Sequence, residues 1–175
     1  MGTIRKIDEE SYSAVARFMS NIKPEWWDYE GAYQQLQDNT MLARLVGWHL
    51  SDDSKIMGWI LCAEYDGYSV LSIENLGYDD NGQFIIDDHL ESLLRKAEEH
   101  AISRGYRCLK FITGSTGMSC HGKSIRDFAT ELKTLTADER KDYDFFLTHG
   151  FVPTGFVPNC YGNGFHGIIL IKPLV

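Results

Sequence analysis

The chain has 175 residues, of which 43% are hydrophobic and 24% are charged, and its formal net charge is −8. This length suits one domain with a single core, and the ordinary apolar content argues against disorder. The negative charge argues against a nucleic-acid surface, because phosphate binding requires clustered Lys and Arg. The same charge mildly favours cationic partners such as amines.

The sequence contains no recognisable targeting or membrane segment. Residues 1–7 are short and polar, three acidic residues follow them, and no apolar run approaches the ~18 residues of a membrane helix. We therefore expect a cytoplasmic protein that makes no membrane contact. The four cysteines form no C-x-x-C pair and the six histidines are scattered, so neither disulfides nor a metal site are expected.

The first third of the chain predicts one strand and two helices. Alternation over 3–7 predicts a strand, and Asp8 can cap a helix over about 9–20. Pro24 then predicts the start of a second helix, because a first-turn N–H has no helical partner. That helix is rich in large side chains that either line a substrate pocket or, as the more common alternative, form core: Trp26, Trp27, Tyr29, Tyr33 and Leu36.

Three β-rich runs follow, and short polar turns separate them. They cover residues 41–49, 55–65 and the segment from Tyr68, and the turns are at 51–54 and Asp66-Gly67. Sequential strands with such turns predict an antiparallel meander.

A strand–helix–strand pattern comes next. Residues 70–76 predict a strand, 78–83 a polar loop, 88–104 a helix and 107–113 a second strand. The helix has one apolar stripe, which consists of Leu90, Leu93, Leu94, Ala97 and Ala101. In such a unit the helix N-terminus lies beside the end of the first strand, where phosphate-bearing cofactors often bind.

The last third predicts two helices and a hairpin. Residues 124–135 have helical spacing, and 136–139 resemble a capping box for a helix that ends at Gly150. The strands of the hairpin are expected at 151–156 and 165–171. The whole pattern predicts a single α/β (α+β) domain over 1–175, with a mixed, mostly antiparallel sheet of about seven strands flanked by helices.

Two motifs carry a resemblance to a known family. Residues 93–106 (LLRKAEEHAISRGY) are similar to the central helix, and 145–151 (FFLTHGF) to the end of the last helix, of the GNAT superfamily of N-acetyltransferases. The resemblance implies that acetyl-CoA is the co-substrate and that a small-molecule amine accepts the acetyl group. A homodimer is compatible with it.

The loop that holds the acetyl-CoA pyrophosphate in that family departs from the family's pattern here. The family has Arg/Gln-x-x-Gly-x-Gly/Ala, whereas alignment on Gln83 places Ile86 and Asp88 at the glycine positions. Alignment on Leu93-Leu94 instead places Ile86, Asp88 and Leu90 there, so neither register supplies the glycines. Four aspartates lie in or beside this loop: Asp79, Asp80, Asp87 and Asp88. Each would add about 1 kcal/mol of repulsion toward a bound diphosphate. By resemblance, the cofactor-binding positions are Leu76, Gly77, Tyr78, Gly82, Gln83 and Asp88.

The catalytic candidates also come from the resemblance. Glu74 interrupts an apolar strand where the family often places a general base, and burial would raise its pKa; the alternative is a solvent-facing strand position. Glu64 is a weaker candidate. Phe146 occupies the position of the family's tyrosine acid, and Tyr143, three residues earlier, is the replacement on the same helix face.

Two functions remain open from the sequence. The first is an N-acyltransferase that moves an acetyl group directly from acetyl-CoA to a small amine. The second is a non-catalytic binding or regulatory module on the same fold, since folds host unrelated functions. A nucleophile–base pair of Cys120 and His121 is disfavoured, because adjacent side chains on one loop seldom face each other.

Overall fold

The computed structural model describes residues 2–38, 42–52, 55–79, 88–138 and 140–174. The chain divides into two compact units, Met1–Arg107 and Cys108–Val175, and each is described by itself. The expectation of a single domain stays a prediction.

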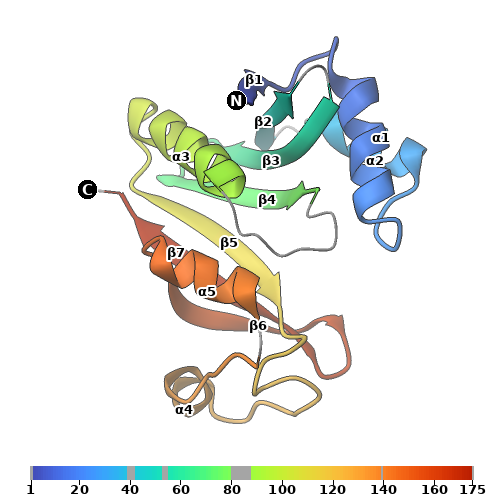
Figure 1. Cartoon of the computed structure of the whole chain (residues 1–175). Coiled ribbons are helices and arrows are strands. Elements are labelled where there is room, and N and C mark those ends of the chain that lie inside the picture. Colours follow the sequence, from blue (N-terminus) through green and yellow to red (C-terminus); the bar gives the residue numbers. More distant parts are fainter. Residues whose placement is uncertain (1, 39–41, 53–54, 80–87, 139, 175) are drawn as a thin grey trace. The chain divides into compact units, whose positions relative to one another are not determined.

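The first unit contains four strands, β1 (Thr3–Lys6), β2 (Ala43–Asp52), β3 (Lys55–Tyr65) and β4 (Val70–Tyr78) (Figure 1). Each strand pairs antiparallel with the next. The pairing of β2, β3 and β4 confirms the predicted meander of three strands, and β1 adds a further strand beside β2. The turn between β3 and β4 contains Gly67 at φ +80°, a left-handed conformation that favours glycine.

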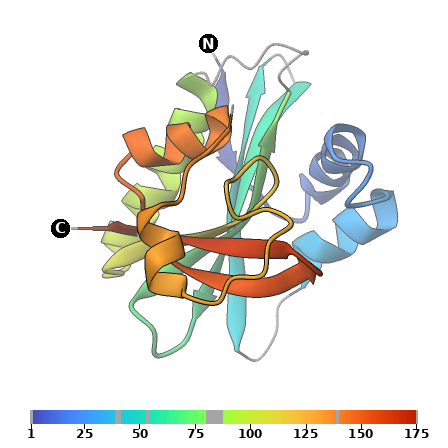
Figure 2. The same cartoon turned by 90° about the horizontal axis from the view of Figure 1, so that it is seen from below.

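Three helices cover this sheet: α1 (Tyr12–Ile22), α2 (Tyr29–Gln37) and α3 (Asp88–Ser103). The helices α1 and α2 lie side by side (Figure 2) and share a core with β2 and β3 that includes Met19, Leu36 and Trp59. Helix α3 packs against β2, β3 and β4, and all five residues of its predicted stripe are buried. The period of 3.6 residues therefore identified the inward face of α3 correctly.

The predicted start of the second helix is wrong. Residues 24–27 form a turn, and α2 begins at Tyr29 because the Asp28 carboxylate accepts a hydrogen bond from the Gly31 N–H at 2.8 Å. Trp26 is consequently exposed on the turn, whereas Trp27, Tyr29, Tyr33 and Leu36 pack on the core. The start of the first helix also differs from the prediction: α1 begins at Tyr12 with Ser11 as its N-cap, and the Asp8 carboxylate accepts from the Ser11 N–H at 3.2 Å in the turn before it.

The second unit contains three strands, β5 (Cys108–Gly114), β6 (Val152–Gly162) and β7 (Phe165–Pro173). Strand β7 pairs antiparallel with both β5 and β6, and β6 and β7 form the predicted hairpin. The turn of this hairpin is at residues 163–164, so β6 and β7 are both longer than the predicted strands at 151–156 and 165–171.

The two helices of this unit are shorter than predicted. Helix α4 covers only Phe128–Lys133, because the Asp127 side chain caps it, and α5 covers Lys141–Thr148. The capping box at 136–139 is wrong: Ala137 forms a β-bridge with Met118, and the Thr136 N–H donates to Ser119 Oγ. The backbone of residues 136–138 therefore pairs with the loop at 117–119 instead of starting a helix, and Glu139 lies outside the described residues.

With its strands and helices, the chain has the predicted α+β class. Every strand pair described within each unit is antiparallel. In the described part of the chain, we find no helix with the length and apolarity that a membrane crossing requires.

Candidate functional site

A β-bulge in β4 places Glu74 out of register with β3. Ile73 is opposite Cys62 and Asn75 is opposite Leu61, so Glu74 is the extra residue of β4 between two successive residues of β3. Such a bulge changes the direction of a side chain locally, and bulges are over-represented beside active sites. The hydrophobic pattern alone contained no sign of it.

The bulge turns the Glu74 side chain to solvent. Glu74 is exposed, whereas its neighbours Ile73 and Asn75 are buried. Of the two interpretations left open for this residue, the solvent-facing one is correct, and the expectation of a buried Glu74 is wrong. Burial, the nearby Glu74 charge and a hydrogen bond to Glu74 raise the pKa of the Tyr65 phenol.

The three residues after the bulge are each held by a different contact. The Trp59 indole N–H donates to Asn75 Oδ1 at 2.6 Å, and the Lys23 ammonium donates to the Leu76 carbonyl at 3.0 Å. At Gly77, a Cβ atom would lie only 2.2 Å from the Trp59 ring, so only glycine fits there. The Asn75 side-chain oxygen is thus already used by Trp59.

Lys23 and Trp59 were not identified from the sequence as parts of this region. The only available signal was general: a buried indole N–H usually requires an acceptor. The sequence does not show which acceptor that is.

The predicted cofactor-binding residues lie on two elements of the first unit. Leu76, Gly77 and Tyr78 are the last three residues of β4, and Asp88 is the first residue of α3. Gly82 and Gln83 lie outside the described residues. Asp79, one of the aspartates expected to repel a diphosphate, forms an ion pair with Lys55 at 2.9 Å, which reduces its repulsion.

Glu64 has a structural role that excludes it as a general base. Its side chain is 5% exposed and accepts hydrogen bonds from Arg44 Nε at 2.8 Å and from His100 Nε2 at 2.9 Å, with Arg104 Nε at 3.4 Å. Burial by itself would raise the pKa of Glu64, but these hydrogen bonds outweigh it and hold the pKa below its ordinary value. The carboxylate therefore stays charged and joins β2, β3 and α3.

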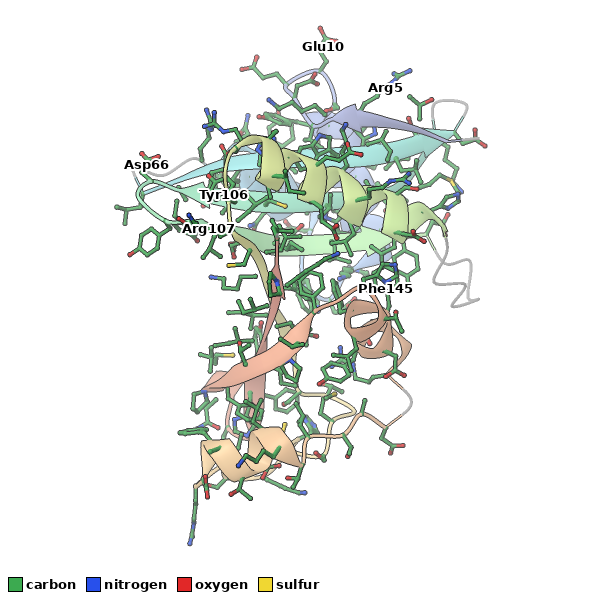
Figure 3. All side chains as sticks on the ribbon, turned by 90° about the vertical axis from the view of Figure 1, so that its left-hand side faces the viewer. Arg5, Glu10, Asp66, Tyr106, Arg107 and Phe145 are labelled. Atoms are coloured by element: carbon green, nitrogen blue, oxygen red, sulfur yellow. The ribbon has the colours of Figure 1, made fainter. Side chains whose placement is uncertain are left out.

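The surroundings of this ion cluster are visible in Figure 3. The labelled Asp66, Tyr106 and Arg107 lie at the same end of the first unit, near the turn between β3 and β4. Burial is the main cause that raises the pKa of the Tyr106 phenol, and the nearby Glu64 charge raises it further. The Arg107 N–H closes this end of the unit by donating to the Ser69 carbonyl at 2.8 Å.

We expect Glu64→Gln to lower the free energy of unfolding at neutral pH by about 1–2 kcal/mol, because it removes the charge that both guanidiniums face. A carboxyl whose folded pKa is depressed stabilises the protein above its unfolded pKa and loses that contribution as pH falls through the folded value. The difference from wild type should therefore shrink in acid. Urea titrations of both proteins at several pH values measure it, with the exposed Glu25→Gln as control; a constant difference down to acid pH would contradict the assignment.

In the second unit, α5 carries the other catalytic candidate. Tyr143 is 4% exposed, and burial raises the pKa of its phenol. Phe146 is buried and packs on Phe111 and Phe151 with ring-centroid distances of 4.6 and 5.1 Å. Phe146 is thus a core residue without an ionisable proton. Of the two helix residues considered for the acid, only Tyr143 carries such a proton.

Cys120 and His121 do not form a pair. Cys120 is buried, and burial raises the pKa of its thiol, so a reactive thiolate is disfavoured. The His121 ring packs edge-on against Phe165 at 4.4 Å, and its Nδ1 lies 3.4 Å from Ser115 Oγ. Among the residues that the structure describes, no group of three or more His, Cys, Asp and Glu could hold a metal ion.

Comparisons by sequence identify no relative. No family model matches the chain, and no curated protein matches it.

Comparison with solved structures does find similar folds. An aminoglycoside 6'-N-acetyltransferase complexed with coenzyme A superposes with a TM-score of 0.85 at 14% identity, over 99% of this chain and 97% of that one. The aminoglycoside 6'-N-acetyltransferase from Enterococcus faecium gives 0.83, with the same identity and coverage. The ribosomal-protein-S18-alanine N-acetyltransferase from Escherichia coli gives 0.68 at 13% identity, over 99% and 94% of the two chains. The chain therefore has the fold of the GNAT superfamily of N-acetyltransferases.

Proposed function

We propose that the protein is an N-acetyltransferase that moves an acetyl group from acetyl-CoA to a small, cationic amine. The observation that carries the proposal is the bulge in β4, which presents the exposed carboxylate of Glu74 immediately before the predicted cofactor-binding residues. The fold supports the same reaction class, because similar structures are N-acetyltransferases and one of them contains coenzyme A.

The residues proposed for acetyl-CoA are compatible with an anionic ligand in the parts that are described. Leu76, Gly77 and Tyr78 offer backbone groups at the end of β4, and Asp88 begins a helix of 16 residues whose N-terminal N–H groups and dipole favour negative charge. The Lys55–Asp79 ion pair offsets one repulsive charge beside them. Gly82 and Gln83 belong to the same proposed set.

In this proposal, the chain contributes a base, hydrogen-bond donors and an acid. The Glu74 carboxylate takes a proton from the acceptor ammonium, directly or through one water molecule, so that the free amine can attack the acetyl carbonyl. Backbone N–H groups of β4 beyond the bulge donate to the oxygen on which negative charge develops. Tyr143 gives a proton to the leaving thiolate, a role for which a phenol kept protonated by burial is suited.

The acceptor class follows from charge. A net charge of −8 and an exposed glutamate at the bulge attract a cation rather than an anion. The three similar structures described above name aminoglycosides and the alanine of a ribosomal protein as acceptors. We place this protein with the first kind, a small polyamine-like molecule. A cytoplasmic location and a homodimer remain predictions.

Isothermal titration with acetyl-CoA, followed by a thiol-release assay, tests the proposal. We expect saturable heat with wild-type protein and thiol release that depends on an added amine, measured with an aminoglycoside, spermidine and an alanine-initiated peptide. Tyr143→Phe should bind acetyl-CoA normally but turn over more slowly. Absence of binding heat at millimolar acetyl-CoA would contradict the enzyme and favour the non-catalytic module.

A further inference from the structure

We propose that Tyr65 is a positioning residue for Glu74: its phenol donates a hydrogen bond that holds the carboxylate in one direction at the β4 bulge. This inference rests on the proposed function, because it concerns the group that would take the proton from the amine. Tyr65 is the last residue of β3 and Glu74 is the extra residue of β4, so both belong to the first unit.

An exposed glutamate has no packing that fixes the direction of its carboxylate. Glu74 is exposed, and a glutamate side chain surrounded by solvent keeps much of its rotamer freedom. A general base must lie within hydrogen-bond reach of the proton that it takes, and a small displacement of a catalytic group slows a reaction strongly. A base at this bulge is therefore expected to have a partner that restrains it.

Two side chains of β3 experience the Glu74 charge. Tyr65 forms a side-chain hydrogen bond with Glu74, and this bond adds to burial and the Glu74 charge in raising the pKa of the phenol. Burial is the main cause that raises the pKa of the Cys62 thiol, and the Glu74 charge raises it further. Cys62 is opposite Ile73 in the register. The Glu74 carboxylate thus lies within electrostatic reach of β3 although its residue is exposed.

The hydrogen bond has a defined direction. An ionised carboxylate is an acceptor only, so the phenol of Tyr65 is the donor. A phenol whose pKa is raised keeps its proton at neutral pH, so this donor is always present. The carboxylate has two oxygen atoms and the phenol occupies one acceptor position, which leaves the other oxygen for the ammonium proton. Tyr65 therefore holds the base without blocking it.

The turn between β3 and β4, which Asp66 marks in Figure 3, fixes Tyr65 itself. The Tyr68 N–H donates to the Tyr65 carbonyl at 3.2 Å, and the two rings meet edge to face with 6.4 Å between their centroids. The preceding residue, Glu64, is held in the ion cluster described above with 5% of its side chain exposed. The phenol is therefore presented from a strand end whose backbone and ring are both restrained, as a positioning residue requires.

Two alternative roles of the Tyr65 hydroxyl give different kinetics. A hydroxyl that only stabilises the fold changes the folded fraction and leaves the kcat of folded protein unchanged. A hydroxyl that binds the acceptor directly sets KM for the amine and leaves kcat unchanged. A positioning hydroxyl sets kcat, and does so only while Glu74 can act as a base, because it acts through that carboxylate.

The experiment is a double-mutant cycle of Tyr65→Phe and Glu74→Gln, with Tyr68→Phe as the matched control. Tyr65→Phe removes one oxygen atom and keeps the ring, and Tyr68→Phe removes the same atom from the exposed ring beside it. Thermal unfolding establishes that each variant is folded, and the thiol-release assay gives kcat and KM for the amine. NMR titration of isotope-labelled tyrosine measures the pKa of Tyr65 without any substrate.

We expect Tyr65→Phe to lower kcat about tenfold with KM for the amine unchanged, and Tyr68→Phe to match wild type. In the Glu74→Gln background, Tyr65→Phe should cause no further loss. The pKa of Tyr65 should be lower in Glu74→Gln than in wild type, because its charged neighbour is gone. Wild-type kcat in Tyr65→Phe, with or without a raised KM, or an additive loss in the double variant would each overturn the inference.

The two proposals fail in different ways. If wild-type protein releases no thiol with any amine, the proposed function is wrong, while the titration of Tyr65 in Glu74→Gln still reports whether the two side chains are bonded. If Tyr65→Phe does not fold, the same titration carries the test, and an unchanged Tyr65 pKa would overturn the inference. If wild type is active and Tyr65→Phe equals it, only the positioning role is wrong.

Discussion

Replacing Glu74 with glutamine is expected to lower kcat about a hundredfold, because an amide of the same shape cannot accept a proton from the acceptor ammonium. Binding of acetyl-CoA should be unchanged, since Glu74 is proposed to act on the amine and not on the cofactor. Steady-state thiol release at saturating amine measures the loss, and isothermal titration measures the binding.

The control for this variant is Glu10→Gln, which removes an exposed carboxylate at the turn before α1 (Figure 3) and should behave as wild type. Exposure makes Glu74→Gln a clean test, because a solvent-facing strand side chain contributes little to stability. Equal kcat in Glu74→Gln and wild type would show that this carboxylate does not act as the base, and the function would then need another proton acceptor.

Replacing Trp59 with alanine is expected to lower the free energy of unfolding by about 3–5 kcal/mol. The side chain is fully buried, packs against Phe18, and donates to Asn75. Its removal leaves a cavity and also leaves the Asn75 oxygen buried without its donor. The free energy of unfolding of a whole domain is only about 5–15 kcal/mol, so this variant would lose much of its stability. Urea titration followed by circular dichroism measures the change.

Trp26→Ala is the matched control for stability. Trp26 is 61% exposed on the turn between α1 and α2, so the same truncation should cost less than about 1 kcal/mol. Similar losses in the two variants would mean that Trp59 is not a central core residue.

Several elements of the fold were predictable from the sequence. Alternation and turn residues identified strand β1 and the meander of β2 to β4, and helical spacing identified α3 together with its five buried residues. These signals are local, because they arise from the side-chain periods of two and 3.6 residues. The motifs at 93–106 and 145–151 then indicated the GNAT fold, which the solved structures confirm.

The predicted ends of the helices were less accurate than the predicted strands. The sequence pattern predicted a start of α2 at Pro24, whereas the structure starts it at Tyr29 with the Asp28 side chain as its cap. The segment 136–139 matches a capping box, yet the backbone groups of Thr136 and Asp138 bond to the loop at 117–119. A contact with residues distant in the chain outweighed a local preference of about 1 kcal/mol.

The sequence by itself determined the order of the strands and helices, the inward face of α3 and the presence of a glutamate in β4. Only the tertiary structure decided that a bulge turns Glu74 to solvent, that Glu64 is held by Arg44 and His100, and that Lys23 binds the Leu76 carbonyl. The physical reason is the range of the interactions. Periodicity is set between residues a few positions apart, whereas register, ion pairs and the contact of Lys23 with Leu76, 53 residues away, depend on packing that no local pattern encodes.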